Sequence, residues 1–218
     1  MGTPTLVIGN RNYSSWSLRA WLALAKLGVD FEEIRVPLFV DGYKQRLLQY
    51  SPAGKVPVYL DGDITVWESL AILEHLAQTH RTLLPEAPRE RALARAIAAE
   101  MHAGFAALRG ALPMNCRASG RRVPISDAVA ADIARVQAIW RTCRAAAANR
   151  GPWLFGTFTL ADAMYAPVAS RFRTYGIACE GAAGEYMRMV LDDPCMRHWY
   201  AVSRRESEVI AEDEAGAV

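Results

Sequence analysis

The chain has 218 residues and a mass of 24.0 kDa, with 25 lysines and arginines against 23 acidic residues. Its composition, 52% hydrophobic with a mean hydropathy of +0.02, is typical of a soluble globular protein with ample material for a buried core. The formal charge of +2 gives no support to nucleic acid as a partner, because such binding depends on positive charge set against phosphate. A chain of this length forms one large domain or two modest ones.

We expect no signal peptide, no membrane span and no metal. The first ten residues lack a basic start and a long apolar run, and charges interrupt the most apolar windows before the ~20 residues that a membrane helix needs. The four cysteines lie far apart, with no CxxC pair and no histidine at ligand spacing, which argues against structural zinc and against a disulfide framework. The four histidines are scattered as well. The sequence therefore predicts a cytoplasmic protein that does not bind a membrane.

The first 81 residues predict alternating strands and helices. A β-branched run at 5–8 predicts a strand, and apolar residues at helical spacing predict a helix over 15–27 that Gly28 ends. A second strand is expected over 31–36, which completes a βαβ unit.

The rest of this region predicts a hairpin and one more helix. Residues 42–50 form a short helix or an irregular stretch. Strands over 56–60 and 64–66 flank Asp61-Gly62-Asp63, which is a signal for a tight turn. A helix over 68–79 follows, so the predicted order is βαβαββα.

A change in composition after two prolines predicts a second domain. We expect an α/β domain over 1–81, a linker over 82–88 and an all-helical domain over 89–218, which is rich in alanine and arginine. Its predicted helices cover residues 89–117, 125–149, 160–174, 184–191 and 194–210. Thr159 and Asp162 have the spacing of a capping box at the start of the third of these helices, which indicates a role in folding.

Three short segments of the first domain have the residue types of a binding site. The first is Gly54-Lys55-Val56-Pro57, where the proline can equally start an edge strand. The second is Trp67-Glu68-Ser69, where a hydroxyl and free backbone N–H groups at a helix start favour a carboxylate, although a helix cap needs no ligand. The third is the stretch 13–19, Tyr-Ser-Ser-Trp-Ser-Leu-Arg, between the first strand and the first helix.

Together with the domain order, these segments resemble the cytosolic glutathione S-transferase family over the whole chain. The resemblance implies a thioredoxin-like α/β N-terminal domain and an all-α C-terminal domain. It also implies glutathione as cosubstrate, a small hydrophobic electrophile as second substrate, a homodimer, and no metal or organic cofactor.

The resemblance assigns glutathione contacts residue by residue. Val56, between Lys55 and a cis Pro57, pairs its backbone with the cysteinyl part of glutathione like an added strand residue. Glu68 and Ser69 match the ammonium and the carboxylate of the γ-glutamyl group.

The stretch 13–19 is similar to the serine-type, zeta-like motif of bacterial members, Ser-Ser-Cys-Ser with an arginine two residues on. By this match Ser14 activates the thiol, Ser15 is the second serine, and Arg19 is the arginine. Trp16 departs from the pattern, which has a cysteine there. A hydroxyl and a helix N-terminus both stabilise a thiolate, but a serine here can equally be only a helix cap.

Alternative activities and the place of the second substrate stay open at this point. The same site would serve a glutathione-dependent disulfide or peroxide reductase or an isomerase, and the fold can also be a non-catalytic binding module. We expect Tyr13, Trp16, Arg109 and Arg117 at the mouth of the electrophile pocket. Much of the apolar stripe on the helix over 89–117 must be core, and the end of that helix, residues 112–117, is expected near the pocket. The stripe consists of Met101, Phe105, Leu108 and Leu112.

Overall fold

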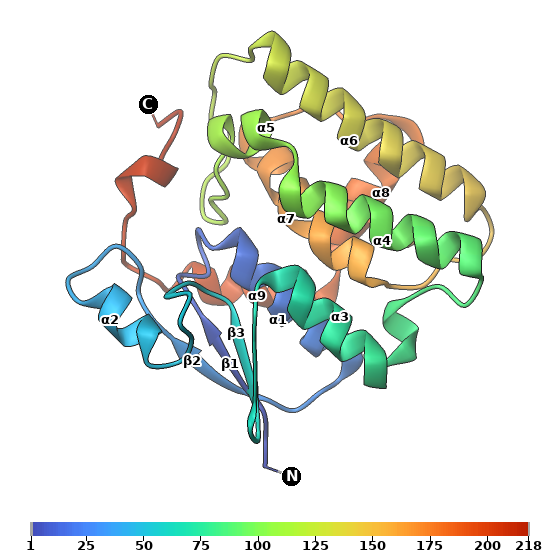
Figure 1. The fold of residues 1–218 in the computed structure, drawn as a ribbon. Helices are drawn as coiled ribbons and strands as arrows, with labels where there is room; N and C mark the ends of the chain where they lie inside the picture. Colours follow the sequence, from blue (N-terminus) through green and yellow to red (C-terminus); the bar gives the residue numbers. More distant parts are fainter. Residues whose placement is uncertain (1, 218) are drawn as a thin grey trace.

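One mixed sheet of four short strands forms the base of the molecule in the computed structural model, which describes residues 2–217 (Figure 1). The strands are β1 (Thr5–Ile8), β2 (Glu32–Arg35), β3 (Val58–Asp61) and β4 (Ile64–Trp67), in the order β2-β1-β3-β4. β1 pairs parallel with β2 and antiparallel with β3, and β3 and β4 form the antiparallel hairpin. The predicted βαβ unit and hairpin are confirmed, each strand within two residues.

Side chains that alternate along the strands pack on opposite faces of this sheet. Leu6 and Ile8 belong to the main core, which includes the buried faces of α1 (Ser15–Leu27) and α3 (Ser69–Thr79). Val7 and Val58 point the other way and form a small cluster with Leu47 of α2 (Tyr43–Leu48). The sheet is thus covered by helices on both faces.

The second half of the chain is helical, as expected. After a turn of 3₁₀-helix at Arg81–Leu83 its helices are α4 (Pro88–Ala103), α5 (Ala106–Ala111), α6 (Asp127–Ala146), α7 (Leu160–Tyr175), α8 (Gly181–Asp192) and α9 (Pro194–Ser203). α7 is the central helix, since all its residues except Arg173 are buried and it contacts α1, α4 and α8. None of the helices in residues 2–217 is both long enough and apolar enough to cross a bilayer.

The single helix predicted over 89–117 is wrong, because the chain breaks after Ala103. Gly104 is extended, and a Cβ there would lie 2.7 Å from the Glu100 carbonyl oxygen. Phe105 then adopts a left-handed conformation with φ of 57°. Its ring is nevertheless buried against Tyr165. The apolar spacing therefore continues across the break, and periodicity alone could not reveal it.

The predicted helix over 194–210 is also too long. α9 ends at Ser203, and the chain then runs back along the α/β part, as the red segment of Figure 1 shows. The Glu206 carboxylate accepts the backbone N–H groups of Arg11 and Asn12 at 2.9 and 3.1 Å. These bonds, made with residues almost 200 positions earlier, favour an extended segment over a further helical turn.

Candidate active site

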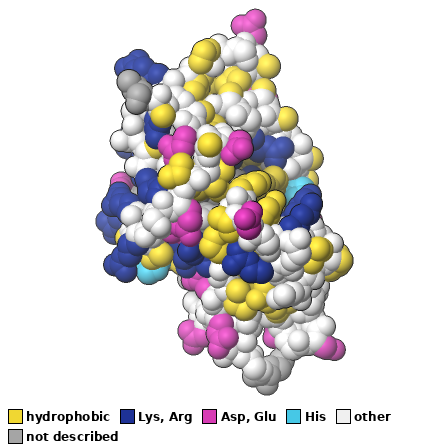
Figure 2. Space-filling view, turned by 90° about the vertical axis from the view of Figure 1, so that its left-hand side faces the viewer, with side chains coloured by type: hydrophobic (Ala, Val, Ile, Leu, Met, Phe, Trp, Pro, Cys, Tyr) yellow, Lys and Arg dark blue, Asp and Glu magenta, His cyan; other side chains and the backbone are white. Residues whose placement is uncertain are grey.

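Two adjoining cavities lie where the α/β part meets the helical part. Their volumes are about 220 and 670 Å³, and they share Trp16, Ala53, Lys55 and Val56. Pro57, Glu68 and Ser69 line the smaller cavity, and Ser14 and Ser15 line the larger one. The structure therefore brings all seven predicted site residues to one continuous hollow. On the face that carries α2, apolar side chains gather near the middle, with acidic and basic groups around them (Figure 2).

Ser14 combines a helix cap with a hydroxyl at the cavity wall. Its Oγ accepts the N–H of Ser17 at 3.2 Å and lies 2.7 Å from the Ser17 hydroxyl. Ser17 Oγ in turn accepts the N–H of Gly9 at 3.0 Å. When Ser17 donates to Ser14, the Ser14 hydrogen is left to point at a ligand. The positive end of α1 adds to the attraction for an anion at this position.

Ser15 is bound to a buried cation that sequence reasoning missed. Arg171 of α7 donates to Ser15 Oγ at 3.1 Å and to the carbonyl oxygens of Arg109 and Leu112. Burial lowers the pKa of Arg171 to about 10, which leaves it charged at neutral pH. In the sequence, Arg171 could have been noticed as the one charged residue in the largely apolar run 163–172.

Two guanidinium groups lie over the Trp16 ring. The Arg19 guanidinium carbon lies 4.2 Å from the ring centroid, and that of Arg109 lies 5.3 Å from it. Arg19 is only 1% exposed and donates to the Met164 carbonyl at 3.2 Å, while its Nη1 has no partner among residues 2–217. Burial, with Arg171 and Arg109 nearby, lowers the pKa of Arg19 to about 9. This side of the site is therefore positive and favours anionic groups.

Val56 presents its backbone to both cavities. The Val56–Pro57 peptide bond is cis, as the resemblance implies. Within residues 2–217 the Val56 N–H and C=O take part in no backbone hydrogen bond, although β3 begins only two residues later. An extended ligand can thus pair with Val56 as an added strand residue would.

Glu68 and Ser69 form the far wall of the smaller cavity. Glu68 has φ of 69° and ψ of 124°, a conformation that side chains rarely adopt and that is found mainly at functional sites. Ser69 is the first residue of α3, and the first turn of this helix has no side-chain cap. The Ser69 side chain is 1% exposed, and its Oγ is buried without a hydrogen-bond partner in residues 2–217. A buried hydroxyl without a partner is uncommon, and a ligand in the smaller cavity can supply one.

His102 of α4 lies beside Glu68 and is a neighbour that sequence reasoning did not find. Its Nε2 is 3.8 Å from a Glu68 carboxylate oxygen, and its ring packs edge-on against Trp16. Burial lowers the pKa of His102 despite the opposing effect of Glu68, which favours the neutral imidazole.

Three of the four residues expected at the mouth of the electrophile pocket, Tyr13, Trp16 and Arg109, line the larger cavity, and Arg117 does not. The Arg117 guanidinium donates to the Tyr13 hydroxyl at 2.8 Å and to the carbonyls of Glu206 and Glu208. It therefore binds the C-terminal segment and does not line the cavity.

The apolar stripe of the segment 89–117 is buried, as expected, and the end of that segment lines the larger cavity through Pro113 and Met114. Met101, Phe105, Leu108 and Leu112 are all core residues. On the helical side the apolar wall includes Ala106, Pro113, Met114 and Ile210, and on the α/β side it includes Leu38, Phe39 and Leu47. Among residues 2–217, no three His, Cys, Asp or Glu side chains come together as metal ligands would.

Comparison with known proteins identifies two matched domains. The family model described as glutathione S-transferase, N-terminal domain, matches residues 13–79, and the one described as glutathione S-transferase, C-terminal domain, matches residues 126–201. A probable maleylacetoacetate isomerase of Caenorhabditis elegans is 39% identical over 104 residues, 47% of this chain and 48% of the relative. Glutathione S-transferase 4 of Zea mays is 40% identical over 83 residues, 37% of either chain. The chain spans about half the length, or less, of the curated relatives it matches.

Solved structures show the same fold over nearly the whole chain. A glutathione transferase homologue from Burkholderia, with bound glutathione, has a TM-score of 0.71 at 21% identity and covers 94% of this chain and 100% of its own. A glutathione S-transferase from the Antarctic clam Laternula elliptica has a TM-score of 0.70 at 17% identity, with 94% and 95% covered.

Proposed function

Because the chain carries the N-terminal and C-terminal domains of the glutathione S-transferase family, we propose that it binds glutathione and activates its thiol for attack on a hydrophobic electrophile. The environment of Ser69 is the observation that carries the proposal. Its buried hydroxyl lacks a partner and lies at the uncapped start of α3, beside a carboxylate. A hydroxyl donor, free N–H groups and a neighbouring anion are the complement of one carboxylate and one ammonium. An α-amino acid group such as the γ-glutamyl end of glutathione has this pair of charges.

The position proposed for the γ-glutamyl group also sets the positions of the cysteinyl backbone and the thiol, because the two cavities adjoin. With the γ-glutamyl group at Ser69, the cysteinyl backbone pairs with the unused N–H and C=O of Val56, and Lys55 lies beside it. The thiol then points into the larger cavity, which Ser14 and Ser15 line.

Ser14 is the group that we assign to thiol activation. A free thiol has a pKa near 8.5, so only a few per cent is thiolate at neutral pH. A hydrogen bond from Ser14 and the positive end of α1 both favour the thiolate and lower this pKa. The thiol proton leaves to solvent, the sulfur forms a bond with the electrophilic carbon, and the leaving group departs with the bonding electron pair.

A second activity is supported by the names of the relatives. Several relatives matched over about a hundred residues are maleylacetoacetate isomerases. The same thiolate would serve an isomerase by adding reversibly to an activated double bond. A panel of glutathione-dependent substrates, including a peroxide and a disulfide, distinguishes transferase, isomerase and reductase. If glutathione does not bind at millimolar concentration, the protein is instead a binding module.

The first prediction tests glutathione binding through Ser69. The Ser69→Ala variant should bind glutathione about 10–100-fold more weakly, because a hydrogen bond to a charged group is worth about 1.5–3 kcal/mol. Calorimetry with the full chain measures the Kd. Thr79→Ala, at the other end of α3, is the control and should leave the Kd unchanged. Equal affinity of the wild type and Ser69→Ala would contradict the proposed position of the γ-glutamyl group.

The second prediction concerns the electrophile. Arg109 lines the larger cavity over Trp16. The Arg109→Gln variant should therefore raise the KM for a carboxylate-bearing nitroaryl halide several-fold more than the KM for its neutral analogue. Steady-state rates at saturating glutathione measure both. Equal changes for the two substrates would show that the charge of Arg109 has no role in binding the electrophile.

The two-fold dimer that the resemblance implies stays a prediction.

A further inference from the structure

A third cavity, of about 410 Å³, lies among the C-terminal helices and shares no lining residue with the candidate active site. Four arginines line it, together with three other residues: Leu191, Asp192 and Tyr200. Four positive charges against one negative charge give the lining a net charge of +3. The chain as a whole has a formal charge of only +2, so the positive charge is concentrated here.

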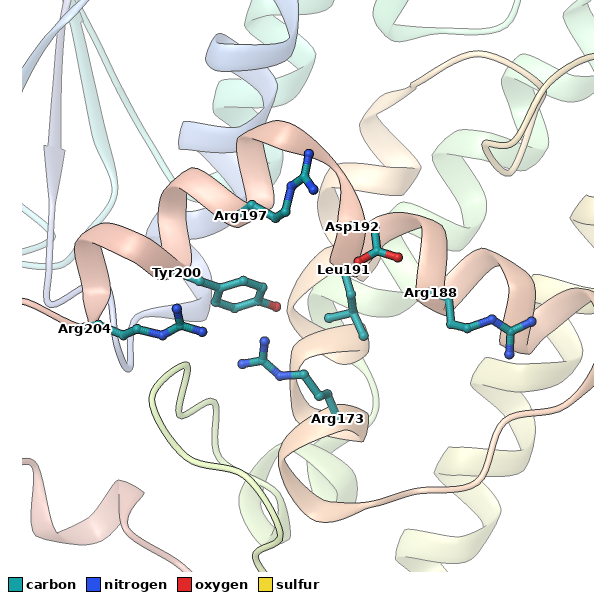
Figure 3. A pocket seen from close by; sticks show the side chains of 7 residues that line it. All are labelled: Arg173, Arg188, Leu191, Asp192, Arg197, Tyr200 and Arg204. Atoms are coloured by element: carbon teal, nitrogen blue, oxygen red, sulfur yellow. The ribbon is translucent and has the colours of Figure 1, made fainter.

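The four arginines come from separate places in the fold. Arg173 is near the end of α7, Arg188 is in α8, Arg197 is in α9, and Arg204 follows α9. Figure 3 shows Arg173 and Arg204 turned toward the same space beside the Tyr200 ring, while Arg188 and Arg197 extend outward at the rim. Within residues 2–217, none of the four forms a salt bridge with a carboxylate. Four like charges beside a single carboxylate, that of Asp192, repel one another, and an anion in the cavity would relieve that repulsion.

Tyr200 and Arg173 add buried donors without partners. The Arg173 guanidinium carbon lies 4.1 Å from the centroid of the Tyr200 ring, and one of its nitrogens donates to the Cys116 carbonyl at 2.9 Å. The Arg173 Nε is buried without an acceptor in the described residues. Tyr200 is 3% exposed, and although its hydroxyl lies near that of Ser170, it makes no hydrogen bond of acceptable geometry. The floor of the cavity thus has donors that a bound acceptor can satisfy.

We propose that this cavity is a binding site for a small phosphorylated molecule with two adjacent phosphate groups. Arginine is suited to phosphate because its planar guanidinium donates two parallel hydrogen bonds to phosphate oxygens. The volume of the recess is that of a small-molecule pocket and not of a flat protein interface. Two linked phosphates carry enough charge to neutralise the +3 lining.

Inorganic pyrophosphate is the probe for this site, and Arg204 is the residue to change. Calorimetry with the full chain should give a Kd below ~1 mM in low salt, and pyrophosphate should raise the Tm. Arg204→Gln should weaken binding about tenfold, because it removes one charge-assisted partner. Arg204 has no hydrogen bond from its side chain in the described residues, so the variant should fold normally and bind glutathione like the wild type.

Arg205→Gln is the matched control. Arg205 is the next residue, is exposed like Arg204 and does not line the cavity, so both variants lose the same net charge. The control should bind pyrophosphate like the wild type, and so should Arg109→Gln, which removes a cation of the active-site hollow. Equal weakening in Arg204→Gln and Arg205→Gln would overturn the site, as would no binding at 10 mM pyrophosphate. A polyglutamate peptide with the same charge as pyrophosphate tests the choice of phosphate. If the cavity binds this peptide through Arg204 and does not bind pyrophosphate, the assignment of the cavity to phosphate is overturned.

Discussion

Replacing Ser14 by alanine should lower kcat/KM at neutral pH by about 10–100-fold and raise the pKa of the bound thiol by about 1–2 units. The proposed hydrogen bond from Ser14 to the thiolate exists only with the ionised sulfur, so its loss, about 1.5–3 kcal/mol, shifts the thiol toward its protonated form. Glutathione affinity should change little, since Val56 and Ser69 remain in place. At a pH above the raised pKa the variant should recover much of the rate. The pH dependence of kcat/KM and the ultraviolet absorbance of the thiolate measure the shift.

Ser15→Ala is the matched control for this experiment. Ser15 is buried like Ser14 and lines the same cavity, but its Oγ already accepts a hydrogen bond from Arg171. Its loss should therefore raise the thiol pKa less than the loss of Ser14. If Ser15→Ala has the larger effect, Ser15 is the activating serine. If neither variant shifts the thiol pKa, activation by a serine hydroxyl is refuted.

The largest loss of stability is expected from Asp162→Ala. The buried carboxylate accepts four hydrogen bonds at 2.8–3.0 Å, and its donors are the Leu154 N–H, the Thr159 N–H and hydroxyl, and the Tyr186 hydroxyl. Each buried donor left without an acceptor costs about 1–3 kcal/mol, though such costs do not add fully. We expect the free energy of unfolding to fall by roughly 3–5 kcal/mol. Urea unfolding at neutral pH measures it.

The loss of stability in Asp162→Ala should depend on pH, because the Asp162 carboxyl titrates. Burial raises the pKa of Asp162 from 3.8 to about 6, against the effect of its hydrogen bonds. Between pH 3.8 and about pH 6 the native state binds more protons than the unfolded state, so the Asp162 carboxyl contributes less stability as pH rises. The difference in stability between the wild type and Asp162→Ala should thus be largest near pH 4 and shrink toward pH 6. Asp30→Ala, at an exposed position shortly before β2, is the control and should change stability by less than ~0.5 kcal/mol. If the free energy of unfolding falls by less than ~1 kcal/mol in Asp162→Ala, the capping box of Thr159 and Asp162 is not a folding element.

Local pattern in the sequence determined the elements and singled out the segments that we propose to contact glutathione. Strand alternation, apolar spacing and turn residues depend on neighbours within a few positions, and they predicted the hairpin and α1 to within a few residues. Ser69 could be singled out for the same reason, because the start of a helix is a local feature, whereas the role of Val56 was implied by the resemblance to the family.

Tertiary structure alone decided which side chains meet. Arg171 binds Ser15 across 156 positions, and Arg117 is turned away from the cavity by a C-terminal segment about 90 residues later. Such pairs depend on how α7 and the last residues pack on α1, and no local period encodes that packing. The break at Gly104–Phe105 was hidden for a related reason, since burial of the Phe105 ring preserves the apolar spacing of a continuous helix. The arginine cavity likewise exists only where α7, α8 and α9 converge, so the sequence shows four scattered arginines and the fold makes them one site.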